Sequence, residues 1–449
     1  MIRGSLNPKD KNVTIVGAGI SGLLSAYYFE KSGFKVSVIE KKPHVGGLIH
    51  TLKTPYGIAE QAAHSILVTD GMKELCQTIQ VNLLPCATKK RYILRKNKIK
   101  IIPLDSIEFL TLLFKATFVK STDLKSETLD KFCIRHLGTA ALEYLLDPFV
   151  TGIFACSPNE LSVKAAFPAI IPSEGKTLVQ HFVKSKKSTK TKRPAMCSVE
   201  YGMQDLVDKL YLYLKDKVTF YFDKEIREIP KGNTVLCGEA YSMTKLFKTD
   251  SLIAQRLEKI QYAPLVSVTV FCRKEIFRKE VDGVGVLVPS AEAKETLGVL
   301  FNSRSFKNRV SDEKYCSFTV MLGGTRKPEA IEYTDEKILT IIKNELSVFF
   351  SGHLLDEFEV KHSVISRWKK AIPIYSNLLL DAWKDIDIEL SKTPGVMLFG
   401  NYTGSVSIRG MQIAAQDLYK NLNNGIPKDT PTLRVYTLSD SDSGSLHAM

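Results

Sequence analysis

The sequence predicts a mixed α/β (α+β) fold made of several domains, on three observations. The chain has 449 residues, more than one core usually holds, so two or three domains are expected. Apolar residues make up 44% of the chain and charged residues 24%, which is an ordinary globular composition. Helical and strand-like patterns then follow in blocks: a strand–helix–strand unit, a helical stretch and a later β-rich stretch.

Residues 12–40 form the first block. A short apolar strand is expected over Asn12–Val16 and a second strand over Lys35–Ile39. Between them a helix is expected from about Ser21 to Ser32, and Gly33 follows it as a stop signal. This order and length are typical of one βαβ unit.

Three glycines lie between the first strand and the helix, as Gly17-x-Gly19-x-x-Gly22. The first permits a tight turn, the second lets a pyrophosphate approach the backbone, and the third lets the helix pack closely on the sheet. The free N–H groups of the helix N-terminus bind phosphate, and Glu40 can accept hydrogen bonds from ribose hydroxyls. The pattern predicts a Rossmann-like dinucleotide site with the contacts Gly17, Gly19, Ile20, Ser21, Gly22, Glu40 and Lys41.

The segment after Glu40 indicates which dinucleotide is bound. It reads KKPHVGGLIHT and contains Gly46, Gly47 and Leu48. It resembles the diglycine signature that follows the ribose acid in FAD-binding, amine-oxidase-like flavoproteins. The resemblance implies FAD as the cofactor, with the diglycine passing close to its diphosphate. The acidic ribose partner also argues against NADP.

Residues 71–184 are predicted to be mostly helical, because apolar residues such as Leu110, Leu113 and Phe114 recur every three or four positions. Ile107–Val119 is apolar over about three turns. At that length a core or channel helix is favoured over a membrane anchor. No apolar run reaches the ~20 residues that a spanning helix needs, so a soluble or peripheral protein is expected.

Later segments are expected to return to the first domain. After a helix over Tyr201–Leu214, three strand-like runs are Val218–Phe222, Glu225–Ile229 and Thr234–Cys237. Near the C-terminus, a strand over Val396–Phe399 precedes a helix over Met411–Leu422. The FAD domain of the resembled flavoproteins is not contiguous, and these segments are implied to complete it. The implied contacts are Ile226 near the adenine and Gly400, Asn401, Val406 and Ser407 near the flavin.

The β-rich block supplies a second sheet. Strands are expected over Leu265–Cys272, Val284–Val288, Thr296–Asn302 and Ser317–Leu322, and a helix over Asp335–Phe350. The predicted domains are a discontinuous FAD-binding domain (1–70, 195–255 and 393–425), an inserted, mainly helical domain (71–194), a substrate-binding β-sheet domain (256–392) and a disordered tail (426–449).

The chain is basic, with a formal net charge of +14, which favours anionic partners. The densest basic run, Lys184 to Arg193, is predicted to be a solvated loop. The eight cysteines show no CxxC pair and no metal-like spacing, so a reducing compartment is expected, with neither disulfides nor a metal. The polar N-terminus lacks a secretory h-region, and a cytoplasmic protein is expected.

Several ordered segments resemble the oxygen-dependent protoporphyrinogen/coproporphyrinogen oxidase family. They span about residues 12 to 420: Asp147–Ala155 continuing to Pro168, Glu200–Gln204, Gly283–Pro289, Leu297–Ser303, Thr319–Gly324 and Lys370–Tyr375. The resemblance implies that a porphyrinogen is dehydrogenated in successive two-electron steps, with hydride passing to FAD and then to oxygen, giving hydrogen peroxide. No catalytic side chain is implied, because the flavin itself oxidises the substrate carbon.

The resemblance places Gly152, Phe271, Cys272 and Met321 in the substrate cavity. For Phe271, Cys272 and Met321, burial in the strand core is the alternative. The segment Glu60 to Leu67 departs from the family, since it holds no Arg or Lys for a substrate carboxylate. His64 is either a substitute for that cation or a histidine that lies on the surface or behind the residues in contact with the substrate.

Several alternatives stay open at this point. The substrate is protoporphyrinogen or coproporphyrinogen, and the rival proteins are an amine oxidase, a carotenoid-type desaturase and a flavin-binding scaffold. Peripheral membrane contact and a homodimer are also open, whereas a nucleic-acid partner is not expected.

Overall fold

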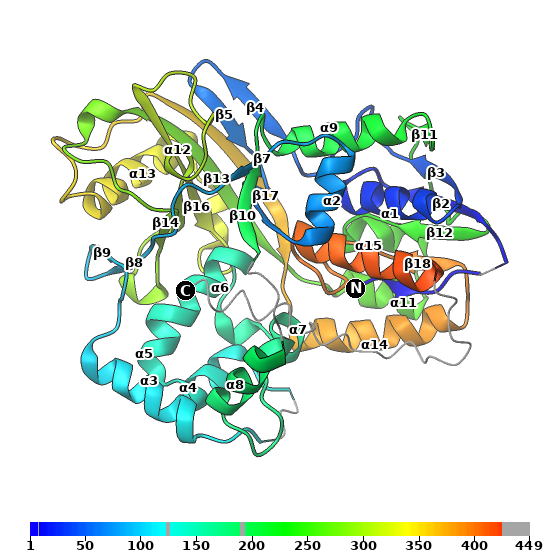
Figure 1. Ribbon diagram of the computed structural model, residues 1–449, viewed down its shortest axis with the longest axis horizontal. Coiled ribbons are helices and arrows are strands. Elements are labelled where there is room, and N and C mark those ends of the chain that lie inside the picture. Colours follow the sequence, from blue (N-terminus) through cyan, green and yellow to red (C-terminus); the bar gives the residue numbers. More distant parts are fainter. Residues whose placement is uncertain (8, 123–125, 189–193, 424–449) are drawn as a thin grey trace.

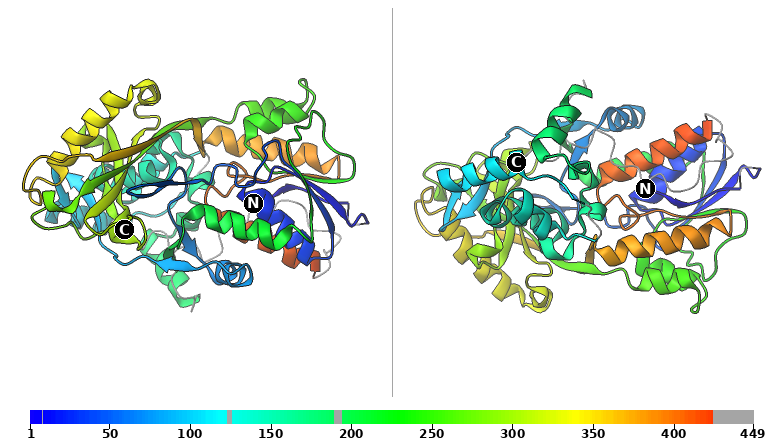
Figure 2. Two further views of the ribbon diagram at one scale, coloured as in Figure 1. Left: turned by 90° about the horizontal axis from the view of Figure 1, so that it is seen from above. Right: turned by 90° about the horizontal axis from the view of Figure 1, so that it is seen from below.

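The computed structural model describes residues 1–7, 9–122, 126–188 and 194–423. A six-stranded sheet lies at one end of the molecule and a seven-stranded sheet at the other, with a helical layer beside them (Figures 1 and 2). The predicted mixed α/β class is confirmed.

The six-stranded sheet joins distant parts of the chain. Its order is β1-β18-β12-β2-β3-β11, and every neighbouring pair is parallel except β1–β18. The strands are β1 (Arg3–Gly4), β2 (Asn12–Val16), β3 (Lys35–Ile39), β11 (Thr219–Tyr221), β12 (Asn233–Leu236) and β18 (Val396–Leu398). The sheet is therefore built from three separate segments of the chain.

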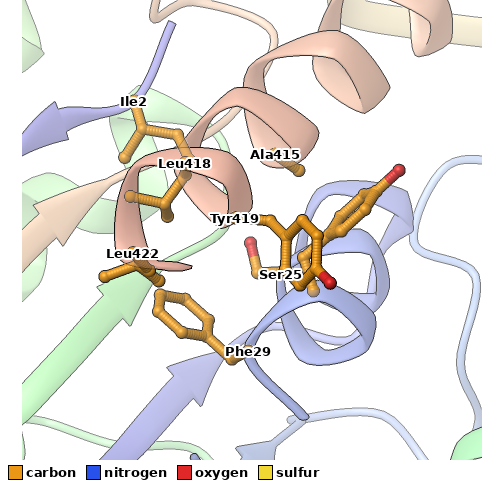
Figure 3. A pocket seen from close by; sticks show the side chains of 8 residues that line it. Ile2, Ser25, Phe29, Ala415, Leu418, Tyr419 and Leu422 are labelled. Atoms are coloured by element: carbon orange, nitrogen blue, oxygen red, sulfur yellow. The ribbon is translucent and has the colours of Figure 1, made fainter. Parts of the chain in front are cut away.

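Helices cover both faces of this sheet. One face carries α1 (Ile20–Lys31), α2 (Asp70–Thr78), α9 (Met203–Leu214) and α15 (Ile408–Asn423); the other carries α10 (Ala240–Met243), α11 (Leu252–Glu258) and α14 (Asn377–Ser391). Residues 21–29 of α1 are all buried because this helix lies between the sheet, α9 and α15. A small apolar gap remains between α1 and α15, and the residues around it include Ile2, Phe29, Leu418 and Leu422 (Figure 3).

One predicted strand of this domain is wrong. Glu225–Ile229 lies in an irregular loop between β11 and β12. Glu225, Arg227 and Glu228 are exposed there, so no alternating buried face supports a strand. The loop is nevertheless anchored to the sheet, because Lys224 N donates to Glu40 O at 3.0 Å.

The seven-stranded sheet has the order β17-β13-β16-β15-β14-β8-β9. Its strands are β8 (Arg91–Arg95), β9 (Lys98–Lys100), β13 (Tyr262–Arg273), β14 (Gly285–Leu287), β15 (Thr296–Phe301), β16 (Tyr315–Gly323) and β17 (His362–Pro373). Helix α13 (Asp335–Phe349) packs on one face, where the alternate residues Val266, Val268 and Val270 of β13 join the same apolar core. The four strands expected in this region are confirmed.

The expectation of a mostly helical stretch from residue 71 is wrong for residues 83–100. These residues form β7 (Leu83–Pro85) and the β8–β9 hairpin, and β8 pairs in parallel with β14 almost two hundred residues later. That pairing is non-local, so helical periodicity in a short window cannot reveal it. The other named strands form two small sheets. In the first, β6 (Ile66–Val68) and β7 flank β10 (Ala195–Val199); in the second, β4 (Thr51–Thr54) pairs with β5 (Gly57–Glu60).

The helical layer comprises α3 (Ser106–Phe118), α4 (Leu129–His136), α5 (Thr139–Ala141), α6 (Asp147–Phe154), α7 (Val163–Ala166) and α8 (Leu178–Ser188). The prediction of α3 as a core or channel helix is wrong. Only Ala116 of this helix is buried, whereas its large apolar side chains are largely exposed. Hydrophobicity alone favours a core position, but α3 lies at the outer edge of the layer (Figure 1).

The basic run at Lys184–Arg193 also differs from the expected loop. Its first five residues continue α8 to Ser188, and residues 189–193 lie outside the described residues, as does the predicted disordered tail. All eight cysteines are free thiols. Within the described ranges, no helix is both long and apolar enough to cross a membrane.

Candidate cofactor and substrate site

A cradle of bare backbone forms where β2 meets α1. We use "glycine cradle" for residues 17–22 together with Gly46 and Gly47. Gly17 has φ +102°, and a Cβ there would lie 2.3 Å from Cys237 O. A Cβ on Gly22 would lie 1.8 Å from Gly17 O, so the third glycine is required for the helix to approach the strand turn.

The diglycine closes the other side of the glycine cradle. Gly46 N donates to Ala18 O at 2.9 Å, and Gly46 pairs with Gly19 in an isolated bridge. Gly46 and Gly47 have φ of +117° and +62°, and a Cβ on Gly47 would lie 3.0 Å from Gly19 Cα. By contrast, a Cβ on Gly19 would lie at an ordinary van der Waals distance, 3.7 Å, from Gly47 Cα, so no close backbone contact prevents a ligand's phosphates from approaching Gly19.

The N-terminus of α1 is suited to an anion. Its N-cap is Gly19, which provides no side-chain hydrogen bond to the first helical N–H groups. Ile20, Ser21 and Gly22 therefore present uncapped backbone donors at the positive end of the helix dipole. This arrangement fits a diphosphate.

Glu40 lies at the end of β3, beside the glycine cradle. Its carboxylate is buried and accepts from Ala18 N at 2.7 Å and from Lys42 N at 2.9 Å. A carboxylate has four lone-pair sites, so capacity remains for a ribose hydroxyl. The loop bearing Ile226 is tied to the same strand end through Lys224, and the exposed Lys41 follows Glu40.

The C-terminal loop, residues 400–407, joins the site from β18. A Cβ on Gly400 would lie 2.9 Å from Gly238 O, just beyond β12. Ser407 Oγ accepts from Gly410 N at 3.1 Å and so caps the first turn of α15. Val406 packs on the core that contains Leu236 and Leu398. The structure thus brings the predicted residues Gly400, Asn401, Val406 and Ser407 to the same sheet edge as the glycine cradle.

Two of the four predicted substrate residues come together. A Cβ on Gly152 of α6 would lie 2.7 Å from Leu287 Cδ2, while one on Gly298 would lie 3.5 Å from Leu287 Cδ2 and 3.7 Å from Met321 Cε. Gly152, Leu287 and Met321 therefore form one apolar surface, which we call the site wall. Leu287 was not among the predicted residues, and its only signal is its place in the GVGVLVP segment.

Phe271 and Cys272 do not join the site wall. Cys272 is fully buried in the core beneath α13, with its Sγ 3.1 Å from Cys316 Sγ. Phe271 is also fully buried and lies near Tyr56 and His362, with ring centroids 6.2 and 6.0 Å away. Both lie near the end of β13 that is remote from Tyr262. This placement favours the alternative of strand core.

The site wall is connected to the C-terminal loop through Tyr375. The ring of Phe154, in the same helix as Gly152, lies 5.5 Å from the Tyr375 ring. The Tyr375 hydroxyl donates to Asn401 O at 2.6 Å. Tyr402 is almost fully buried, so neither tyrosine forms an open aromatic cage.

The segment at residues 60–67 contains a buried polar cluster. The Glu60 carboxylate accepts from Thr51 Oγ1 at 2.7 Å and from Met203 N at 2.8 Å, and burial raises its pKa. Burial and the nearby charge of Arg309 lower the pKa of His64 to about 4. His64 is therefore neutral near pH 7, which counts against its serving as the missing cation.

Arg309 brings the positive charge that residues 60–67 lack. Its Nη2 donates to Ser198 Oγ at 2.6 Å and to Val199 O at 2.9 Å. The guanidinium is buried, which lowers its pKa. Arg309 was not predicted, because it lies more than two hundred residues from the segment that it supports.

Comparison with known proteins agrees with this geometry. A sequence profile described as "Flavin containing amine oxidoreductase" matches residues 20–416. The chain is 27% identical to protoporphyrinogen oxidase 2 of Arabidopsis thaliana, over 90% of this chain and 92% of that protein. It is also 27% identical to coproporphyrinogen III oxidase of Bacillus subtilis, over 87% of this chain and 93% of that protein.

A solved structure from Exiguobacterium sp. 255-15, named as a candidate protoporphyrinogen oxidase, has the same fold. It superposes with a TM-score of 0.74 at 17% identity, covering 92% of this chain and 98% of that one. The glycine cradle, the uncapped helix α1 and Glu40 fit the cofactor that such a fold holds.

Proposed function

The chain belongs to the flavin containing amine oxidoreductase family and is an FAD-dependent oxidoreductase; from that premise we propose that it dehydrogenates protoporphyrinogen IX to protoporphyrin IX. Oxygen is the proposed acceptor and hydrogen peroxide the product, in haem biosynthesis. The observation that carries the proposal is a series of contacts between the site wall and the C-terminal loop. Phe154, in the same helix as Gly152, packs its ring against Tyr375, and the Tyr375 hydroxyl donates to Asn401 O. These contacts support an apolar site wall beside the cofactor. Coproporphyrinogen III is the alternative substrate, since a relative of equal identity bears that name.

FAD would be held by the glycine cradle, Glu40 and the C-terminal loop. Bound FAD would supply the redox chemistry, as acceptor of the substrate's hydride and donor of the electrons to oxygen. The N–H groups of α1 bind its diphosphate, and the N-terminus of α15 points positive backbone charge toward the C-terminal loop. The site wall excludes water from the reacting carbon and binds the apolar macrocycle. No protein nucleophile or base is assigned, since none is needed to take a hydride.

An amine oxidase is the main rival. Its aromatic cage would need accessible tyrosines, but the Tyr375 hydroxyl is bonded to Asn401 O and Tyr402 is buried. The deciding experiment mixes the purified, flavin-loaded protein anaerobically with protoporphyrinogen IX, coproporphyrinogen III or a set of amines. Bleaching of the flavin by a porphyrinogen alone supports the proposal. Bleaching by an amine would refute the proposal. A flavin that none of the substrates bleaches would also refute it, and that result fits a flavin-binding scaffold.

Light scattering on the same sample tests for a homodimer.

We also propose peripheral membrane contact through the outer face of α3. Its exposed apolar side chains, with those just before it and on α8, are Ile101, Ile102, Ile107, Phe109, Leu110, Leu113, Phe114, Phe118, Val179 and Val183. Lys96, Lys98 and Lys100 are exposed on the β8–β9 hairpin, which the ion pair of Arg95 with Glu108 at 2.6 Å joins to the first turn of α3. A helix that exposes several large apolar side chains near lysines is typical of a protein that lies on an anionic bilayer.

Vesicle co-sedimentation tests this contact. The triple variant Leu110→Ser, Phe114→Ser, Phe118→Ser should remain in solution with vesicles containing phosphatidylserine, whereas the unmodified protein should sediment. Leu112 is unsuitable for replacement, because it is partly buried against the core. The control replaces Leu355 and Leu378, each 61% exposed elsewhere on the surface, by Ser. Equal sedimentation of the triple variant and the control would contradict the proposal.

A further inference from the structure

The site wall is shared between two layers of the molecule, so its shape depends on how they are joined. Gly152 comes from α6 in the helical layer, whereas Leu287 and Met321 come from β14 and β16 of the seven-stranded sheet. The side chain of Leu287 already fills the position where a Cβ on Gly152 would lie. A small displacement of α6 therefore opens or closes the site wall.

A turn after β16 holds the C-terminal end of α6. We call residues 323–326 the clamp turn; they overlap the end of β16 and of the Thr319–Gly324 segment singled out in the sequence. A Cβ on Gly324, which has φ +66°, would lie 2.3 Å from Ala155 O. Thr325 N donates to Ala155 O at 2.8 Å, and the Thr325 hydroxyl bonds to Glu160. Only a glycine in this left-handed conformation allows so close an approach.

Arg326 holds the other end of α6. Its Nη2 donates to Thr151 Oγ1 at 3.1 Å and lies 3.4 Å from Asp147 Oδ2, while Nη1 donates to Val288 O at 3.1 Å. One guanidinium thus joins α6 to the residue after Leu287. Thr151 is the residue directly before Gly152, so the contact acts on the part of the helix that lines the site.

Asp147 completes the junction. Its carboxylate accepts from Ser290 N at 2.6 Å and from Ser290 Oγ at 2.8 Å. The Asp147 and Arg326 side chains are only 9% and 14% exposed. A buried ion pair contributes little net stability compared with an apolar pair of similar shape. Its directional hydrogen bonds instead define one arrangement of the surfaces that it joins.

We propose that Arg326 is a positioning residue, which acts through Thr151 and Asp147 to fix Gly152 against Leu287 and so sets the width of the substrate site. The inference rests on the proposed function, because it assumes that the macrocycle lies against the site wall. It names a residue that acts on substrate binding and not on the cofactor.

The test uses a pair of neutralising variants. Arg326→Met alone leaves Asp147 buried without its partner and can unfold the protein, so the main variant is Asp147→Asn with Arg326→Met. Its flavin content should be unchanged and its kcat altered less than about twofold. Its KM for the porphyrinogen should rise by about tenfold, because misplacing a binding surface by roughly 1 Å weakens binding without altering the flavin. The single variant Arg326→Lys should raise the KM less than the double variant does, because the lysine can keep the contact with Asp147.

The matched control is Arg256→Met with Asp385→Asn. This pair joins α11 and α14 at 2.5 Å, is also partly buried, and lies outside the site. Its KM should be that of the unmodified protein. If both double variants lose the same thermal stability and neither changes KM, Arg326 has only a structural role and the proposal is wrong.

A second readout separates this inference from the proposed function. If the unmodified protein oxidises no porphyrinogen, the proposed function fails. The positioning role of Arg326 is then tested by amide hydrogen exchange. Faster exchange of residues 151–155 in the Asp147/Arg326 variant, with no change in α1, supports the positioning role. Unchanged exchange there would overturn it.

Discussion

The glycine cradle and the site wall are held by different kinds of contact. In the glycine cradle, backbone meets backbone: Gly22 lies against Gly17 O, and Gly46 N donates to Ala18 O. At the site wall, side chains from distant segments hold α6 in place through Arg326, Thr151 and Asp147. The difference teaches that Gly17 and Gly22 of the cofactor site tolerate no added atoms, whereas the site wall depends on charged side chains and on the register between layers.

Gly22→Val should have the largest effect. Its Cβ would lie 1.8 Å from Gly17 O, and this backbone atom cannot move without breaking the turn between β2 and α1. The strain exceeds the total stability of a typical domain, about 5–15 kcal/mol, so we expect no soluble folded protein. Soluble yield and circular dichroism measure it. Gly33→Ala is the control, since Gly33 has φ +76° in open space and the change should cost only about 1 kcal/mol. A folded Gly22→Val protein would contradict the close approach.

Gly19→Val should separate folding from cofactor binding. The nearest atom to a Cβ on Gly19 is 3.7 Å away, so the chain should fold. The added side chain occupies the space through which the pyrophosphate approaches, so the protein should purify without FAD. The flavin absorbance and a thermal melt measure the two effects, and Gly19→Ala should show a smaller loss. A full complement of FAD in Gly19→Val would show that the diphosphate lies elsewhere.

Acid should weaken the helical layer through His136. Burial lowers the pKa of His136 in α4 from 6.5 to about 4, and its ring lies 4.6 Å from Phe132. The unfolded chain therefore binds a proton between these values that the folded protein does not bind. The free energy of unfolding should fall by about 2 kcal/mol as the pH drops from 6.5 toward 4. Thermal melts across this range measure it. His136→Phe should remove that part of the pH dependence; an equal slope in the variant would exclude His136 as its cause.

Leu110→Ser should have the smallest effect on stability. Leu110 is 64% exposed on α3, so its replacement should change the free energy of unfolding by less than about 0.5 kcal/mol. Leu129→Ala in α4 is the comparison, because Leu129 is fully buried and its truncation should cost about 2–5 kcal/mol. Urea unfolding of both variants gives the values. A large loss for Leu110→Ser would mean that the outer face of α3 is covered in solution.

The same contrast explains how much the sequence could predict. Strands β2 and β3 and the glycines of the cradle were predicted because each needs only its immediate neighbours, and their spacing is set by one turn. Arg309, Arg326 and Leu287 were missed, because their partners lie far away along the chain. The β8–β9 hairpin was taken for helix for the same reason: its pairing partner, β14, lies almost two hundred residues later in the chain.

Burial explains the remaining errors. The apolar spacing of α3 identifies a helix correctly, but it cannot tell whether the apolar face meets a core or the outside. Cys272 and Met321 both lie in predicted strands. The face of the sheet on which each side chain lies decides which of them reaches the site wall. Strand β17 and helix α14 were not predicted, although β17 is one of the longest strands of its sheet.

The place of β18 has a consequence for synthesis of the chain. This strand lies between β1 and β12 in the six-stranded sheet, yet it is among the last segments to leave the ribosome. At about 5–20 residues per second, β12 emerges roughly 8–32 s before β18. During that interval the exposed edge of β12 is open to wrong partners. A chaperone that shields this edge until β18 arrives would raise the yield of folded protein more than one that acts after release.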